Sequence, residues 1–369
     1  MEIYVFVYLL LVVTIIFDKE KYSQNIKNII LLFDVILMSC FVGLRWKIGS
    51  DWDQYFDCFR TIKENEMFHY YRYGNQYFEP LYSFINWFTK YLVGPDGYSF
   101  FLFWTTLFRY SLIAYLCKEL SIYPVLSFVA YVSIELGFPT ARTAVSMALV
   151  LASYVYIVKR NLKYYLLLII TAVLIHKMCI IFIPMYWIYG KFRINYMAAM
   201  LLYTLSIFFS IVADRYLPGI GQVISIYVGE GDMQEKIETY SSWQTNEGAL
   251  KSISSYFLSY FWITLFYYQK NKIAIYKEDM TKYNYLLSTY VFSLCIVSAF
   301  ALFFSDLTRL SIIFNTWFLL LAWSFKVWKS YQNWLIIMFM LFFLYRLSQF
   351  FKNIYFEDYY LPYKWILNV

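Results

Sequence analysis

Charged residues and histidines are both scarce in this chain. Only 15% of its 369 residues are Asp, Glu, Lys or Arg, and just two are His. A soluble domain carries about a quarter charged residues, whereas 61% of this chain is hydrophobic and its mean hydropathy is +0.52. The composition therefore argues against a soluble fold.

Cysteines are few and have no metal-binding or redox spacing. None of the five lies in a CxxC pair or near a histidine at a ligand-like spacing, and most are within apolar runs: Cys40, Cys58, Cys117, Cys179 and Cys295. This pattern suggests neither a metal site nor a disulfide framework. Dense basic runs are also missing, so the net charge of +7 does not indicate a nucleic-acid footprint.

Apolar runs recur along the whole chain, separated by polar links. They lack the period-two alternation of barrel strands, and in lipid the remaining way to satisfy the backbone is the helix. We therefore predict an all-α fold, one polytopic integral membrane domain over residues 1–369 with about 12 transmembrane helices. Residues 1–17 lack a basic start and a cleavage site, so we expect a retained span there and not a signal peptide. The predicted spans are 3–17, 29–44, 98–116, 122–138, 143–158, runs ending at 175 and 189, 196–213, a run ending at 268, 284–304, 310–325 and 334–351.

The links alternate in charge, which predicts the orientation. Links after odd-numbered spans hold 15 Lys and Arg residues, and short basic links stay in the cytoplasm. We therefore expect both termini to be extracytoplasmic, together with two long polar segments, 45–97 and 214–252.

Several ionisable residues are predicted near membrane depth, where a charge usually faces a bundle interior or a wet cavity. Arg142, His176 and Arg309 stand at three different hairpins on the predicted extracytoplasmic side, at the depth of Arg45. Asp34 and Arg346 are predicted to lie in the middle of spans, where each fits a structural ion pair or a polar contact between helices. The complete set is Asp34, Arg109, Glu135, Arg142, His176, Arg309 and Arg346.

Such a group of cations suits a phosphorylated lipid. Guanidinium groups bind phosphate oxygens bidentately and stay charged. They would stabilise the charge that develops on a polyprenyl diphosphate leaving group, while a general base takes the proton from an attacking sugar hydroxyl. The available bases are Asp51, Asp53, Glu79 and His176, and the aromatic segment 69–78 offers flat faces to sugar rings or to the membrane interface.

The stretch Arg45-Trp46-Lys47-Ile48-Gly49-Ser50-Asp51-Trp52 resembles the Arg-x-x-x-Gly-[Ser/Thr]-Asp-aromatic signature of the EpsG family of Wzy-like polysaccharide polymerases. Three positions depart from the family pattern: Trp52 stands where Tyr is usual, and Thr143 and Ala144 stand where Gln and an aliphatic residue are common. Further segments resemble the family in order: Glu79-Pro80-Leu81, Arg142-Thr143-Ala144, His176-Lys177, Thr308-Arg309-Leu310 and Leu361-Pro362-Tyr363.

This resemblance implies a GT-C-like glycosyltransferase at the outer face of the bacterial cytoplasmic (inner) membrane. It would join undecaprenyl-diphosphate-linked oligosaccharide units into O-antigen of lipopolysaccharide, capsule or exopolysaccharide, with no cofactor and no required metal. Its partners would be the lipid-linked oligosaccharide and membrane lipid, with a chain-length regulator and a flippase as further candidates and no nucleic acid. We expect Arg45, Arg142 and Arg309 to hold the donor and acceptor diphosphates, with Arg109 as an additional candidate.

The other role assignments concern proton transfer and sugar binding. We expect Asp51 to be the general base, with His176 as the second candidate. Glu79, Asp53 and Tyr55 would contact the sugar.

Two alternatives stay open at this stage. A flippase of the same lipid-linked unit needs polar groups at mid-bilayer and near the inner face, whereas the unusual charges here are predicted to cluster on the outer side, which favours an enzyme. An O-antigen ligase-like transferase shares the chemistry and is harder to separate from a polymerase.

Overall fold

The structure is a computed structural model that describes residues 2–49, 51–68, 71–72, 76–134, 141–216, 248–273, 277–300, 311–351 and 360–366. It divides into two compact units. The first comprises Met1–Arg72, Tyr77–Trp187 and Leu321–Val369, and the second comprises Tyr73–Gln76 and Ile188–Leu320. Every candidate site residue named above except Arg309 belongs to the first unit. Arg309, Glu135 and most of segment 214–252 lie outside the described residues.

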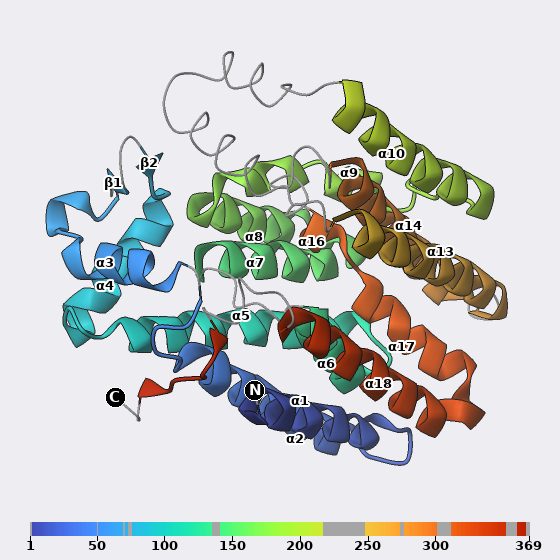
Figure 1. Ribbon diagram of the computed structural model, residues 1–369, viewed down its shortest axis with the longest axis horizontal. Helices are drawn as coiled ribbons and strands as arrows, with labels where there is room; N and C mark the ends of the chain where they lie inside the picture. The colour runs from blue at the N-terminus through green and yellow to red at the C-terminus, as the bar shows by residue number, and fades with distance from the viewer. Residues whose placement is uncertain are drawn as a thin grey trace. The chain divides into compact units, whose positions relative to one another are not determined.

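The first unit is built from helices. Figure 1 shows α8, α7, α5 and α2 in successive layers, and neighbouring helices in this series are in contact. The short strands β1 and β2 form a two-stranded sheet. In chain order the elements are α1 (Glu2–Thr14), η1 (Ile15–Asp18), α2 (Gln24–Gly43), α3 (Trp52–Thr61), η2 (Glu64–Glu66), β1 (Tyr71–Arg72), β2 (Gln76–Tyr77), α4 (Pro80–Val93), α5 (Tyr98–Leu120), α6 (Pro124–Ile134), α7 (Ala141–Val158), α8 (Leu162–Ile175), η3 (Lys177–Phe182), α9 (Met185–Ile188), most of α17 (Trp317–Val327), η4 (Lys329–Tyr331) and α18 (Gln332–Phe351).

A close approach of two helices positions the residue that carries the first family motif. Gly43 is the last residue of α2, and a Cβ atom placed on it would lie 2.5 Å from Cα of Phe103 in α5. Only glycine permits the two backbones to come this near. Arg45 follows two residues later, so the packing of α2 on α5 fixes where that side chain begins.

Substituting this glycine should destabilise the protein. We expect Gly43→Ala to lower the free energy of unfolding by about 1–3 kcal/mol, because the new methyl group meets backbone that cannot rotate away. Thermal unfolding in detergent measures the effect. The matched control is Ile36→Ala, also in α2 but 47% exposed, for which we expect a change within about 0.5 kcal/mol. Equal melting temperatures for Gly43→Ala and wild type would contradict the proposed close contact.

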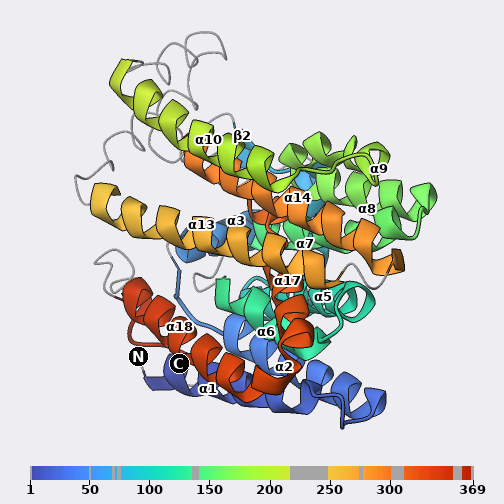
Figure 2. The same ribbon diagram turned by 90° about the vertical axis from the view of Figure 1, so that its right-hand side faces the viewer.

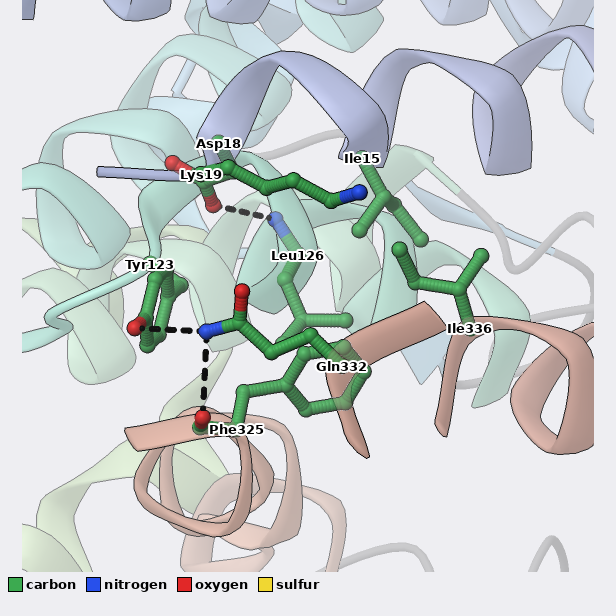
Figure 3. Close-up of a pocket in the computed structure, with 8 residues that line it drawn as sticks. All are labelled: Ile15, Asp18, Lys19, Tyr123, Leu126, Phe325, Gln332 and Ile336. Carbon is green, nitrogen blue, oxygen red and sulfur yellow. Dashed lines mark hydrogen bonds between the residues drawn. The ribbon is translucent and has the colours of Figure 1, made fainter. Parts of the chain in front are cut away.

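Hydrogen bonds tie together the ends of several elements around a small cavity in the first unit (Figure 3). The Asp18 carboxylate accepts from the Leu126 N–H at 2.9 Å, and the Gln332 side-chain amide donates to the Tyr123 hydroxyl at 3.0 Å and to the Phe325 carbonyl at 3.2 Å. The cavity measures about 10 Å³, the size of roughly one water molecule. Since none of the described residues that line it is a predicted site residue, it is a packing feature of η1, α6, α17 and α18.

The second unit contains α10 (Tyr196–Tyr216), α13 (Gly248–Ile273), α14 (Lys277–Phe300), α16 (Ser311–Phe314) and the start of α17. Figure 2 shows α10, α13 and α14 side by side. The Tyr283 hydroxyl donates to the Phe266 carbonyl at 2.7 Å and so joins α14 to α13. Leu201, Leu205 and Phe208 of α10 are more than half exposed, as expected for side chains that face lipid.

By length and composition, five described segments could each cross a membrane: Gln24–Gly43, Tyr98–Leu120, Ala141–Val158, Tyr196–Ala213 and Met280–Phe300. Ser311–Val327 and Lys329–Ser348, which meet at 97°, are a sixth candidate as one broken span. Shorter apolar helices coincide with three further predicted spans: Pro124–Ser133, Leu162–Ile175 and Lys177–Ile188. The chain is thus a helical multi-pass membrane protein, which confirms the predicted class apart from β1 and β2. The count of twelve spans, the GT-C-like fold and the single domain stay predictions.

Candidate functional site

Three predicted site residues from distant parts of the chain meet at one point. Glu79 directly precedes α4, where Pro80 occupies the first helical position, a position that suits its fixed φ and missing N–H. Arg142 is in the first turn of α7. His176 ends α8 in an extended conformation and precedes η3, at the break predicted between two spans. Each side chain therefore stands at the end of a helix.

The Glu79 carboxylate is the centre of this group. Its Oε2 accepts a hydrogen bond from Arg142 Nη1 at 3.1 Å, and its Oε1 accepts from the Lys177 backbone N–H at 3.1 Å. His176 Nδ1 lies 3.3 Å from the same Oε1. This contact lacks hydrogen-bond alignment. We call these three side chains the Glu79 cluster.

Burial and charge act in opposite directions on Glu79. The side chains of Glu79, His176 and Arg142 are only 10%, 15% and 18% exposed. Burial by itself would raise the pKa of Glu79, but the neighbouring His176, the Arg142 guanidinium and the Lys177 N–H together lower it to about 2. Glu79 is therefore an anion at every physiological pH.

An aromatic wall adjoins the cluster. The Arg142 guanidinium lies 5.5 Å from the centre of the Phe78 ring, a cation–π distance. Phe78 stacks on Tyr55 of α3, with ring centres 5.7 Å apart and planes 16° apart. Tyr82 meets both rings edge-on. Tyr55, a predicted sugar contact, is thus brought next to the cluster, although it is only 4% exposed.

The Arg45 guanidinium is buried and bound to two nearby backbone carbonyls, one in the last turn of α2 and one in the loop that follows. It is 6% exposed, with Nη1 donating to the Val42 carbonyl at 2.6 Å and Nε to the Ile48 carbonyl at 3.0 Å. Gly49 follows with φ +109° and no atom near the position of a Cβ, so glycine is needed here for conformation and not for space.

Arg45 and Arg109 border the same small cavity. Arg109, in α5, is 2% exposed, and its guanidinium lies 4.7 Å from the centre of the Tyr110 ring. Thr105 and Thr106 contribute polar groups to the wall, and Ala141 places the cavity beside the start of α7. The cavity measures about 10 Å³, so a diphosphate could enter only if neighbouring groups moved.

The structure places the remaining predicted residues outside this group or leaves them undescribed. Asp51 is the N-cap residue of α3 but makes no capping hydrogen bond with its side chain. Asp53 is exposed in the first turn of α3. Arg309 lies outside the described residues. Among the described residues, no group of three or more His, Cys, Asp and Glu side chains could hold a metal ion.

The segments that hold Phe78 and Lys177 were recognised in the sequence, but their contacts with the cluster were not predicted. The Lys177 N–H donates to Glu79, and the Arg142 guanidinium lies 5.5 Å from the centre of the Phe78 ring. The C-terminal residues also reach the Arg45 loop: Arg45 forms an antiparallel bridge with Trp365. Residues 361–363 resemble a family motif, which suggested that they matter, but the sequence did not predict that they lie beside the Arg45 loop.

The Glu79 cluster has the components of a proton-transfer site. A carboxylate beside Nδ1 orients an imidazole and leaves Nε2 to accept a proton. Arg142 adds a fixed positive charge nearby, and among the described residues nothing accepts a hydrogen bond from its buried Nε. That donor is suited to a phosphate oxygen.

Comparison with known proteins identifies the family of the chain. No curated protein and no solved structure matches the chain. The family model described as EpsG family matches residues 28–365, nearly the whole chain, and the matched range includes the Arg45 loop, the Glu79 cluster and the C-terminal residues 360–365. The chain therefore belongs to the EpsG family.

Proposed function

We propose that this protein is a GT-C-like polysaccharide polymerase that joins undecaprenyl-diphosphate-linked oligosaccharide units by glycosyl transfer. EpsG-family proteins are Wzy-like polymerases, so family membership suggests the reaction class. The observation that carries the proposal is the Glu79 cluster, in which an imidazole and a guanidinium each lie within 3.3 Å of one carboxylate. An acid–base pair beside a fixed cation matches the needs of glycosyl transfer from a diphosphate.

In the proposed mechanism, a hydroxyl of the acceptor sugar attacks the anomeric carbon of the donor. A new carbon–oxygen bond forms as the bond to the diphosphate oxygen breaks, and undecaprenyl diphosphate leaves with the electron pair. Nε2 of His176 takes the hydroxyl proton. Glu79 holds the ring and stabilises its protonated form, while Arg142 neutralises charge on the leaving group.

This assignment makes His176 the first candidate for the general base and Asp51 the second. Glu79 itself, with a pKa of about 2, is too weak a base to accept a proton near pH 7. Asp51 stands at the start of α3, and its position is determined by that helix end. His176 combines a basic nitrogen, a carboxylate at 3.3 Å and a cation on the same carboxylate, so we propose His176 as the base and Glu79 as its positioning residue.

A second cationic position would serve the second lipid-linked substrate. Polymerisation needs two diphosphates, one leaving with its lipid and one retained on the acceptor. Arg142 lies at the proposed base, so it would contact the leaving diphosphate. Arg45 and Arg109, which border one cavity, would hold the other after a small opening of that site, and Arg309 stays a candidate for either.

The location is also part of the proposal. The charge distribution of the links predicts that residues 45–97 lie on the outer side of a bacterial cytoplasmic membrane, where lipid-linked units would be available. O-antigen, capsule and exopolysaccharide all fit this placement. A flippase or a ligase-like transferase would use similar lipid-linked substrates.

A gene-deletion strain separates these activities. In the deletion strain we expect surface glycan that carries a single repeat unit. Restoring the wild-type gene should restore the ladder of polymer lengths. Loss of all surface glycan would indicate a flippase instead, and accumulation of lipid-linked polymer would indicate a ligase. Either result would contradict polymerisation.

Asp51→Asn tests the choice of base in the same strain. We expect the polymer yield to fall by less than about tenfold, since Asn is as good an N-cap residue as Asp and keeps its shape. The measurement is ladder intensity on a gel at matched protein level. A loss as complete as that of His176→Ala would contradict the assignment and return Asp51 to the role of base.

A further inference from the structure

The C-terminal residues of the first unit pair with the loop that carries Arg45. The Trp46 N–H donates to the Lys364 carbonyl at 3.0 Å, and the Ile366 N–H donates to the Leu44 carbonyl at 3.1 Å. Together they form the antiparallel bridge between Arg45 and Trp365. Residues 360–366, which we call the C-terminal strap, thus add a short strand to this loop.

The register of this bridge determines which side chains are neighbours. Both hydrogen bonds flank the central pair, so Arg45 and Trp365 occupy a non-hydrogen-bonded position. In such pairs the two Cα atoms are about 4.5 Å apart and the side chains lie on the same face. Trp365 is therefore the cross-strand neighbour of the Arg45 side chain.

Aromatic contacts hold the strap in place. The Tyr363 ring stacks on Phe41 of α2, with centres 4.9 Å apart and planes 13° apart, and its hydroxyl donates to the Phe41 carbonyl. The Tyr4 hydroxyl of α1 donates to the Tyr360 carbonyl at 2.9 Å. The Phe41 contacts anchor the strap to the end of α2 from which Arg45 emerges, and the Tyr4 contact anchors it to α1.

We propose that the C-terminal strap, through Trp365, positions the Arg45 guanidinium for diphosphate binding, an inference that rests on the proposed function. Arg45 is held on one side by the carbonyls of Val42 and Ile48 and on the other by the C-terminal strap, which is more than 300 residues away in sequence. A guanidinium binds a phosphate well only when its planar donors are aligned. Loss of the Trp365 ring would therefore let the aligned side chain rotate and would weaken binding more than turnover.

A double-mutant cycle tests this coupling directly. The variants are Trp365→Ala, Arg45→Lys and the combination, and the measured quantity is the Kd of the purified protein for undecaprenyl diphosphate in detergent. We expect Trp365→Ala to raise Kd about tenfold in the wild-type background. In the Arg45→Lys background, where the planar fork is already gone, the same change should raise Kd less than about twofold.

Further measurements separate positioning from folding. Trp365→Phe retains a ring in this place and should keep Kd within about twofold of wild type. Trp365→Leu, which fills part of the space without a ring, replaces Trp365→Ala in the cycle if the latter does not yield monodisperse protein. At saturating substrate, kcat of Trp365→Ala should stay within about threefold of wild type, so that the loss is seen in KM. The control is Trp334→Ala, which removes a 67% exposed aromatic ring from α18 and should leave Kd unchanged.

Equal increases in Kd in both backgrounds would overturn the inference, because they would show that Trp365 acts independently of Arg45. An unchanged Kd in Trp365→Ala would overturn it as well. The proposed function fails separately: a wild-type protein that binds undecaprenyl diphosphate but makes no polymer from lipid-linked units contradicts polymerisation and leaves the coupling between Trp365 and Arg45 intact.

Discussion

Replacing His176 by Gln should lower the rate of polymer formation by about 10²- to 10⁴-fold, the range expected for loss of a general base. Gln keeps polar groups at this position but cannot accept a proton near pH 7. The Glu79–Arg142 ion pair does not involve His176, so the fold should remain. The measurement is the initial rate with purified protein and lipid-linked oligosaccharide, together with the ladder in a deletion strain.

Rescue by a small base distinguishes chemistry from structure at this position. His176→Gly leaves space for a free imidazole, so added imidazole should restore part of the lost rate in a concentration-dependent way. Arg142→Ala, which removes a charge and not a base, should gain nothing from imidazole. A His176→Gln variant that retains more than about a tenth of the wild-type rate would exclude His176 as the general base.

Glu79→Gln should reduce both activity and stability. The change leaves the Arg142 guanidinium buried without its anion, and removal of one partner of a buried pair costs about 3–5 kcal/mol. We expect the lower end of that range here, since the side chains are 10–18% exposed and Gln can still accept one hydrogen bond. The rate of polymer formation should fall about 10²-fold, because His176 loses the carboxylate that orients it.

The stability effect of Glu79 has a predictable pH dependence. The pKa of Glu79 in the folded protein is about 2, below its ordinary value of 4.5, so folding favours the ionised form. This contribution is fully present above about pH 4.5 and is lost as the pH falls toward 2. The difference in melting temperature between wild type and Glu79→Gln should therefore be largest near neutral pH and should narrow below about pH 4.

An exposed ion pair provides the matched control. Glu119 pairs with Lys159 at 2.6 Å, but these side chains are 28% and 51% exposed. Pairs of this kind contribute about 0–1 kcal/mol, so Glu119→Gln should change neither the melting temperature nor the polymer ladder appreciably. If Glu79→Gln behaved like Glu119→Gln, the Glu79 cluster would not be the functional centre.

Local sequence patterns predicted the helical membrane class and several element ends. The two-residue break at residues 176–177 appeared as a gap between apolar runs, and α8 does end there. These signals are local, because a hydrophobic run acts on its own backbone.

Which site residues come together in space could not be predicted from the sequence. Glu79 was expected to contact sugar, but its partners are 63 and 98 positions away, and no local pattern encodes which hairpins adjoin. Arg45 was expected to face a ligand, yet two of its donors bind the backbone carbonyls of Val42 and Ile48. The helices α3 and α4 within the polar segment 45–97 were also not foreseen, since their aromatic side chains resemble those of an interfacial loop.

The bridge between Arg45 and Trp365 has a consequence for biosynthesis. Residue 365 is made about 320 residues after residue 45, which at roughly 10 residues per second is about half a minute of translation. During that interval α2 can enter the membrane and pack on α5, but the loop after it lacks its partner strand. The proposed diphosphate site would therefore be completed only when translation is nearly finished, so that ribosome-bound and prematurely terminated chains would bind lipid-linked substrate weakly.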